Sequence, residues 1–151
     1  MKDSNLYTIL IVEDNLGDYL LAKVYLEEMF LNLEIHHCEN FKQAKDFKQS
    51  TNIHLDVILL DLSLPDMSKD FLMKEILLLF SNTPLIVLTG YSHFSFAIKT
   101  ITLGACDYLL KDGLNEMILY KSIIYSIERN KHIIKHAEAE KEYADLFHLS
   151  P

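Results

Sequence analysis

The 151-residue sequence contains few of the residues that mark several protein classes. It has two cysteines, four glycines, three prolines and no tryptophan. Cys38 and Cys106 lack any C-x-x-C or Cys/His spacing, so buried free thiols are expected in place of disulfides or a zinc site. No apolar run approaches the roughly 20 residues of a membrane-spanning helix, and the first residues lack the features of a signal peptide. We therefore expect a cytoplasmic protein without a membrane span.

Basic residues are also scarce, with 14 Lys and Arg against 22 Asp and Glu and a formal net charge of −8. Proteins that bind the nucleic-acid backbone need clustered Lys and Arg, so no nucleic-acid partner is expected. Hydrophobic residues make up 50% of the chain and charged residues 24%. This is enough apolar surface for a folded core, which argues against a disordered chain. The length fits one domain with an appendage.

Short apolar runs alternate with longer amphipathic segments, as in β-α-β units around a parallel sheet. The runs predict five strands, over residues 7–13, 33–38, 56–61, 85–89 and 106–110. Helices are expected over 16–30, from Asn40 as N-cap to 49, from about 66 to 80, before Gly104, and from about 114 onward.

The first of these helices has an apolar pattern of its own. Leu16, Leu20 and Val24 recur at four-residue spacing, and Leu21 and Tyr25 widen the stripe. This periodicity predicts that the stripe is the packed face of the helix.

Polar residues follow four of the predicted strands. Glu13-Asp14, Asp61, Thr89 and Lys111 stand at strand ends that meet at one edge of a parallel sheet. Carboxylates brought together repel one another unless a cation compensates them, and oxygen ligands alone suit Mg²⁺. Mg²⁺ and Lys111 together can neutralise an incoming phosphoryl group. Asp61 can then act as a nucleophile that forms an acyl phosphate.

Each of these features has a plain structural explanation when taken alone. Glu13-Asp14 is typical of a turn with a helix cap, and Asp61 fits ordinary turn chemistry. Their coincidence at separate strand ends favours a functional site.

A phosphohydrolase of the haloacid dehalogenase type also uses an Asp nucleophile and Mg²⁺, but it needs a second acid two residues later, where this chain has Ser63. A further alternative, besides a phosphoryl-accepting domain and a phosphohydrolase, is a scaffold that binds partners without being phosphorylated.

Four segments resemble the receiver domain of bacterial two-component response regulators. They are residues 9–14, 56–66, 84–90 and 104–111, within a resemblance that covers about residues 6–128. The resemblance implies a flavodoxin-like α/β fold, a doubly wound five-stranded parallel sheet in the order 2-1-3-4-5 with helices on both faces and an extended C-terminal helix. It also implies a phosphorelay signalling switch that assists its own aspartyl phosphorylation and dephosphorylation, as opposed to an enzyme with a separate substrate.

The resemblance assigns the acceptor and the metal ligands. Asp61 would accept a phosphoryl group from the phosphohistidine of a histidine kinase or histidine phosphotransfer protein, in a reaction that depends on Mg²⁺. The carboxylates of Glu13, Asp14 and Asp61 and the backbone carbonyl of Ser63 would hold the Mg²⁺ ion.

The resemblance also assigns a switch. Lys111 would pair with the phosphoryl oxygens, Thr89 would donate its hydroxyl to them, and Tyr108 would turn inward when Thr89 moves. The new dianionic group supplies the physical cause, because it draws the hydroxyl of Thr89 toward itself. The output surface would be formed by the helix that ends at Gly104, the fifth strand and the final helix.

Three features set this chain apart from the family pattern. One is the pair Ser63 and Gly90 beside the acceptor, which is expected to tune how long the phosphoryl group survives. Asp112 follows Lys111, where the family often has proline after a cis bond. A cis bond before another residue costs about 2.5–4 kcal/mol, so a trans bond or a reshaped loop is expected. Lys69 stands where glycine is usual, which predicts a different turn.

No Pro or Gly interrupts residues 114–147, so the last helix should project from a receiver domain at 6–128. Residues 129–151 are expected to form a helical linker, and residues 143–151 resemble the opening of a PAS domain. We therefore expect the N-terminal receiver of a longer sensor or histidine kinase protein. A homodimeric coiled coil competes with a single solvated helix, and its seam would consist of Ile123, Ile127, Asn130, Ile134, Ala137 and Ala144.

Overall fold

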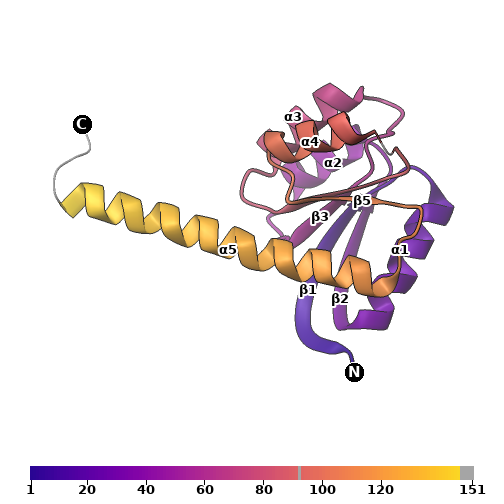
Figure 1. The fold of residues 1–151 in the computed structure, drawn as a ribbon, viewed down its shortest axis with the longest axis horizontal. Coiled ribbons are helices and arrows are strands. Elements are labelled where there is room, and N and C mark those ends of the chain that lie inside the picture. The colour runs from indigo at the N-terminus through magenta and orange to yellow at the C-terminus, as the bar shows by residue number, and fades with distance from the viewer. Residues whose placement is uncertain (92, 147–151) are drawn as a thin grey trace.

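The computed structural model describes residues 1–91 and 93–146, and its ten elements alternate between strand and helix (Figure 1). In chain order they are β1 Asp3–Val12, α1 Leu16–Met29, β2 Phe30–Cys38, α2 Phe41–Ser50, β3 Val57–Leu60, α3 Lys69–Leu79, β4 Leu85–Thr89, α4 Phe94–Leu103, β5 Asp107–Leu110 and α5 Glu116–Leu146. The alternation of five strands with five helices confirms the pattern expected from the sequence.

The five strands form one parallel sheet in the order β2-β1-β3-β4-β5. This is the flavodoxin-like order, and it confirms the predicted fold class. Helices α1 and α5 cover one face of the sheet, and α2, α3 and α4 cover the other (Figure 1). The central strand β3 is buried on both faces, which is why its sequence is an unbroken apolar run.

Side chains of the inner strands alternate between two hydrophobic cores. Leu10 and Ile58 pack with residues of α2 and α3 in one core, whereas Ile9 and Val57 pack with residues of α1 and α5 in the other. Successive side chains of a strand point to opposite faces of a sheet. The two cores therefore fix the register that brings the strand ends to one edge.

The packed face of α1 differs from the prediction. Ala22 and Leu26 are its buried residues, while Leu16 of the predicted stripe is 62% exposed. The predicted stripe therefore faces solvent along most of its length. The helix carries apolar residues around much of its circumference, so periodicity alone identified an apolar face that is not the packed one.

The starts of α2, β2 and β1 can be compared with the boundaries expected from the sequence. The side chain of Asn40 accepts a hydrogen bond from the backbone N–H of Gln43, which confirms the predicted N-cap of α2. Strand β2 starts at Phe30, directly after α1, and β1 reaches back to Asp3. The carboxylate of Asp3 accepts hydrogen bonds from the hydroxyls of Tyr7 and Tyr120, so the start of β1 is tied to α5.

Helix α5 runs far beyond the body of the domain (Figure 1). Its last buried residue is Ile127, and the side-chain amide of Asn130 donates a hydrogen bond to the Asn82 carbonyl at 3.2 Å. The first half of the predicted coiled-coil seam thus packs on the domain itself. Residues 147–151, which include the end of the PAS-like segment, lie outside the described residues. Among the described residues, no helix combines the length and apolarity needed to span a membrane.

Candidate functional site

The predicted site residues lie at the carboxyl edge of the sheet. Backbone hydrogen bonds continue past the strand ends and fix this edge: the N–H of Asp61 donates to the carbonyl of Val12 at 2.9 Å, and the N–H of Lys111 donates to the carbonyl of Thr89 at 2.9 Å. Side chains that are distant in the sequence are therefore held by neighbouring strands. This follows from the parallel topology.

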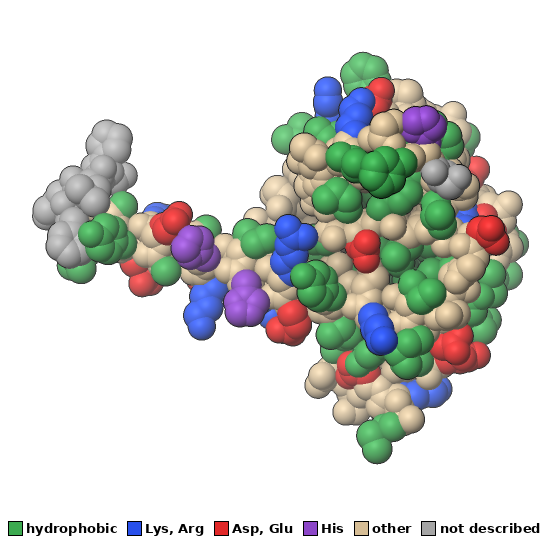
Figure 2. Space-filling view, in the orientation of Figure 1, with side chains coloured by type: hydrophobic (Ala, Val, Ile, Leu, Met, Phe, Trp, Pro, Cys, Tyr) green, Lys and Arg blue, Asp and Glu red, His purple; other side chains and the backbone are tan. Residues whose placement is uncertain are grey.

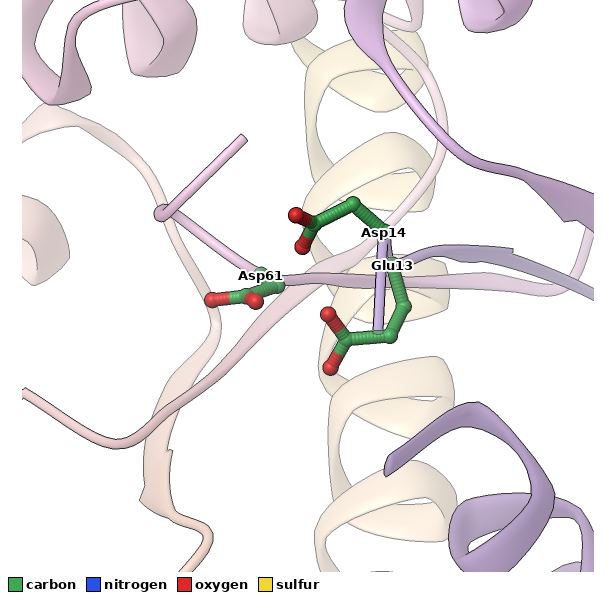
Figure 3. Close-up of side chains that lie close together, drawn as sticks. All are labelled: Glu13, Asp14 and Asp61. Atoms are coloured by element: carbon green, nitrogen blue, oxygen red, sulfur yellow. The ribbon is translucent and has the colours of Figure 1, made fainter. Parts of the chain in front are cut away.

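Three carboxyl groups meet at this edge (Figure 3). One oxygen from each of Glu13, Asp14 and Asp61 lies within 4.8 Å of the others. Glu13 and Asp61 are only 4% and 5% exposed, respectively, whereas Asp14 is exposed to solvent. An all-oxygen set of this kind fits a hard divalent cation such as Mg²⁺.

The ammonium group of Lys111 lies among these acids. Its Nζ atom is 2.5 Å from Glu13 Oε1, 3.1 Å from Asp61 Oδ2 and 2.7 Å from Asp18 Oδ2. Burial alone lowers the pKa of Lys111, but the hydrogen bonds to Asp18 and Glu13 and the charge of Asp61 outweigh burial and raise the pKa. The Lys111 side chain therefore stays protonated and supplies a positive charge at the site.

The two buried acids titrate in opposite directions. Burial, followed by the hydrogen bond with Asp61, raises the pKa of Glu13 to about 8. Burial also tends to raise the pKa of Asp61, but hydrogen bonds from Glu13 and from the N–H of Ser63 and the charge of Lys111 lower it overall. The two carboxyl groups are close enough to titrate as a coupled pair, with the pKa of Glu13 raised and that of Asp61 lowered.

Thr89 and Tyr108 are linked through the backbone of Tyr91. Thr89 is fully buried, and its Oγ1 accepts a hydrogen bond from the N–H of Tyr91 at 3.3 Å. The hydroxyl of Tyr108 donates to the carbonyl of the same residue at 2.5 Å. The two predicted switch residues are thus connected through one peptide segment.

Two of the departures noted in the sequence, at Asp112 and Lys69, can be followed in the structure. No cis peptide bond occurs among the described residues, so the bond between Lys111 and Asp112 is trans, as expected. Lys69 begins α3, and its ammonium lies 3.6 Å from the centroid of the Tyr91 ring. The residue that replaces glycine therefore makes a cation–π contact with the segment between Thr89 and α4.

Sequence reasoning missed two residues that surround the site. Asp18, on the first turn of α1, contacts Lys111, but Asn15-x-x-Asp18 has the appearance of helix capping alone. His37 contacts the carbonyl of Glu13 through Nε2 at 2.8 Å and stacks on Tyr19 with 3.7 Å between ring centroids. No local signal in β2 distinguishes this histidine.

A 2-1-3-4-5 parallel sheet with clustered acids, a threonine and a lysine at its carboxyl edge defines a signal-receiver module. The family model described as the response regulator receiver domain matches residues 9–122, about three quarters of the chain. The chain belongs to the response regulator receiver domain family.

Individual relatives agree with this assignment. The regulatory protein AtoC of Escherichia coli is 30% identical over 131 residues, which cover 85% of this chain and 27% of AtoC. The transcriptional regulatory protein YdfI of Bacillus subtilis is 35% identical over 112 residues, covering 74% of this chain and 51% of YdfI. The chain thus spans about a quarter to a half of the length of these relatives.

A solved structure of a similar protein has the same fold. The Mn²⁺-bound form of response regulator Rcp1 is 27% identical and superposes with a TM-score of 0.64, covering 78% of this chain and 88% of that one. Receiver domains are signalling modules, and the family therefore favours the switch over the phosphohydrolase alternative.

Proposed function

We propose that Asp61 accepts a phosphoryl group from the phosphohistidine of a histidine kinase or histidine phosphotransfer protein. The observation that carries this proposal is the environment of Asp61, a buried carboxylate 3.1 Å from the Lys111 ammonium inside the cluster of acids (Figure 3). The N–H of Ser63 donates to Asp61 Oδ1 at 3.1 Å, which aims the carboxylate. Oδ2 can then attack phosphorus while the histidine nitrogen departs.

Mg²⁺ would be held by the carboxylates of Glu13, Asp14 and Asp61 and by the backbone carbonyl of Ser63. The relative Rcp1 has been solved in a form with bound Mn²⁺, and the all-oxygen donor set here supports the same preference for a divalent ion. When bound, the ion supplies positive charge that stabilises the phosphoryl oxygens. Lys111 supplies a second positive charge and would pair with those oxygens directly.

The switch would act through Tyr91. A phosphoryl group on Asp61 attracts the hydroxyl of Thr89, and this removes the acceptor of the Tyr91 N–H. Movement of that peptide segment also disturbs the hydrogen bond from Tyr108 to the Tyr91 carbonyl. The Tyr108 ring would then lose its outward anchor and turn inward, which changes the surface formed by α4, β5 and α5.

The surface of α1 supports docking of a histidine-bearing partner. The exposed apolar residues Leu16, Leu20 and Val24 lie on the helix that starts directly after the acidic loop. An exposed apolar stripe beside a reactive site is typical of an interaction surface. The occupant would be a helix of the kinase or phosphotransfer protein that presents its phosphohistidine to Asp61.

The surface formed by α4, β5 and α5 also exposes apolar side chains. Ile98 on α4 and Ile118 and Tyr125 on α5 are exposed, and a groove of about 700 Å³ is lined by Leu109, Ile118 and Tyr125, among others. Figure 2 shows hydrophobic side chains over the part of the molecule that contains α4. This surface would transmit the state of Tyr108 to a downstream module.

The chain is proposed to divide into a receiver at residues 6–128 and a helical linker at 129–151. The linker would lead to a PAS or kinase module in the same protein, and the projecting part of α5 supports this arrangement (Figure 1). A homodimer would use the helix beyond the domain, where Ile134 is exposed. The dimer seam would start after Asn130, because earlier seam residues pack on the domain.

Intact-protein mass spectrometry tests the proposed phosphorylation. The chain is incubated with Mg²⁺ and a small-molecule phosphodonor, beside Asp61→Asn, a sample with chelator, and the matched exposed variant Asp46→Asn. We expect the mass of one phosphoryl group on the unmodified chain and on Asp46→Asn, and none in the other two samples. Absence of any gain, with a histidine phosphotransfer partner as well, would support the scaffold alternative.

A further inference from the structure

Asp18 has a geometry that helix capping does not explain. It lies on the first turn of α1, where its backbone N–H donates to the side chain of Asn15 at 2.9 Å. In a reciprocal capping box the Asp18 carboxylate would accept the N–H of Asn15. That N–H instead donates to Glu13 Oε2 at 3.3 Å, and the Asp18 carboxylate contacts Lys111 at 2.7 Å.

The three carboxylates that contact Lys111 among the described residues are not equivalent. Glu13 and Asp61 belong to the acid cluster, so a divalent cation in that cluster would take oxygens from both and repel the ammonium group. Asp18 lies outside the cluster, although it is one of the two nearest acids to Lys111. Its contact with Lys111 can therefore persist when the cluster holds a cation.

Lys111 also has space into which it could move. A cavity of about 80 Å³ is lined by Asp18, Lys111, Leu88 and Leu114, among others. A long, flexible lysine stem beside such a space requires a fixed partner to keep its charge in one place. Asp18 is attached to a rigid helix, and its charge is also favoured at the helix N-terminus.

We propose that Asp18 is a positioning residue that holds the Lys111 ammonium beside Asp61 while a divalent cation occupies the acid cluster. Its effect on phosphoryl transfer rests on the proposed function of Asp61. The retained ammonium is then in place to pair with the phosphoryl oxygens as they arrive. Asp18 itself touches neither the cation nor the phosphoryl group.

If Asp18 positions Lys111, its removal should slow phosphorylation. If Asp18 acts only through its negative charge, its removal should have the opposite effect on the rate. Removing one negative charge makes the site less repulsive to an anionic phosphodonor, so simple charge predicts faster phosphorylation. Loss of a positioning contact predicts slower phosphorylation, because Lys111 is no longer held in place. Asp112→Asn is the matched control, since exposed Asp112 adjoins Lys111 in sequence and its substitution removes the same charge.

The rate of phosphorylation by acetyl phosphate at saturating Mg²⁺ distinguishes these cases. We expect Asp18→Asn to be roughly tenfold slower than the unmodified chain, and Asp112→Asn to be as fast or faster. Asp18→Glu restores the charge and should recover much of the rate. A rate for Asp18→Asn at or above that of the unmodified chain would overturn the proposal.

Side-chain NMR of chains labelled with ¹⁵N-lysine gives a test that does not need phosphorylation. With Mg²⁺ present, the ammonium signal of Lys111 should be protected from solvent exchange in the unmodified chain and in Asp112→Asn, and lost in Asp18→Asn. Protection that survives in Asp18→Asn would overturn the proposal whatever the rates. If the unmodified chain accepts no phosphoryl group, the proposed function of Asp61 fails, and the NMR result alone decides the role of Asp18.

Discussion

Glu13 is predicted to lower the stability of the metal-free fold at alkaline pH. Its pKa is raised from 4.5 to about 8, so the folded state holds the proton more tightly than the unfolded state. The free energy of unfolding therefore falls as the pH rises between these two values. Asp61 does not oppose this change, because its pKa is lowered and it stays ionised throughout that range.

The expected magnitude follows from the same values. One pH unit is worth about 1.4 kcal/mol, so raising the pKa from 4.5 to about 8 costs the fold up to about 5 kcal/mol once Glu13 is ionised. Lys111 and water at the sheet edge relax around the new charge, so we expect a loss of roughly 2 kcal/mol between about pH 5.5 and about pH 8.

The perturbation that tests this prediction is Glu13→Gln, which keeps the shape of the side chain and cannot ionise. With chelator present, the free energy of unfolding of the variant should match that of the unmodified chain at about pH 5.5 and exceed it by roughly 2 kcal/mol at about pH 8. Urea unfolding followed by circular dichroism suits a chain without tryptophan, and exposed Glu39→Gln is the matched control. A variant that is less stable at the higher pH, or a difference independent of pH, would refute the reasoning.

Three further predictions concern stability. Millimolar Mg²⁺ should raise the Tm of the unmodified chain in calorimetry but not that of Asp61→Asn, because a ligand of the folded state stabilises it; an equal rise in both would place the cation elsewhere. Ser126 Oγ is buried without a hydrogen-bond partner among the described residues, so Ser126→Ala should leave the free energy of unfolding unchanged or raise it by up to about 1 kcal/mol; a clear loss in urea unfolding would reveal a partner. Tyr120→Phe removes the hydroxyl that donates to Asp3 at 3.0 Å and should cost about 1 kcal/mol in the same assay; unchanged stability would show that water replaces the contact.

The strand-end residues were predictable because parallel topology decides where they go. Once the apolar runs are strands of one parallel sheet, Glu13, Asp61 and Lys111 must meet at its carboxyl edge, and the structure brings them within contact distance. Sequence order and strand type are sufficient for this step. No side-chain packing needs to be known.

Contacts that depend on the orientation of a helix were not predictable. Periodicity placed Leu16 on the packed face of α1, whereas Ala22 and Leu26 are buried there. The rotation of α1 about its axis is set by tertiary packing, which no local pattern encodes. The same rotation directs Asp18 toward Lys111, so one missing piece of information accounts for both the error and the omission.

The charges at the sheet edge explain why the site is suited to a divalent cation. The carboxyl groups of Glu13, Asp14, Asp18 and Asp61 outnumber the single ammonium group of Lys111 at this edge. A divalent ion balances that excess and can displace the proton from Glu13, so its binding should strengthen as the pH rises toward about 8. The buried carboxyl that is predicted to destabilise the metal-free fold would then be a ligand whose desolvation the cation offsets. On the proposed metal set, the Glu13 side chain would therefore link the stability of the domain to the occupancy of its site.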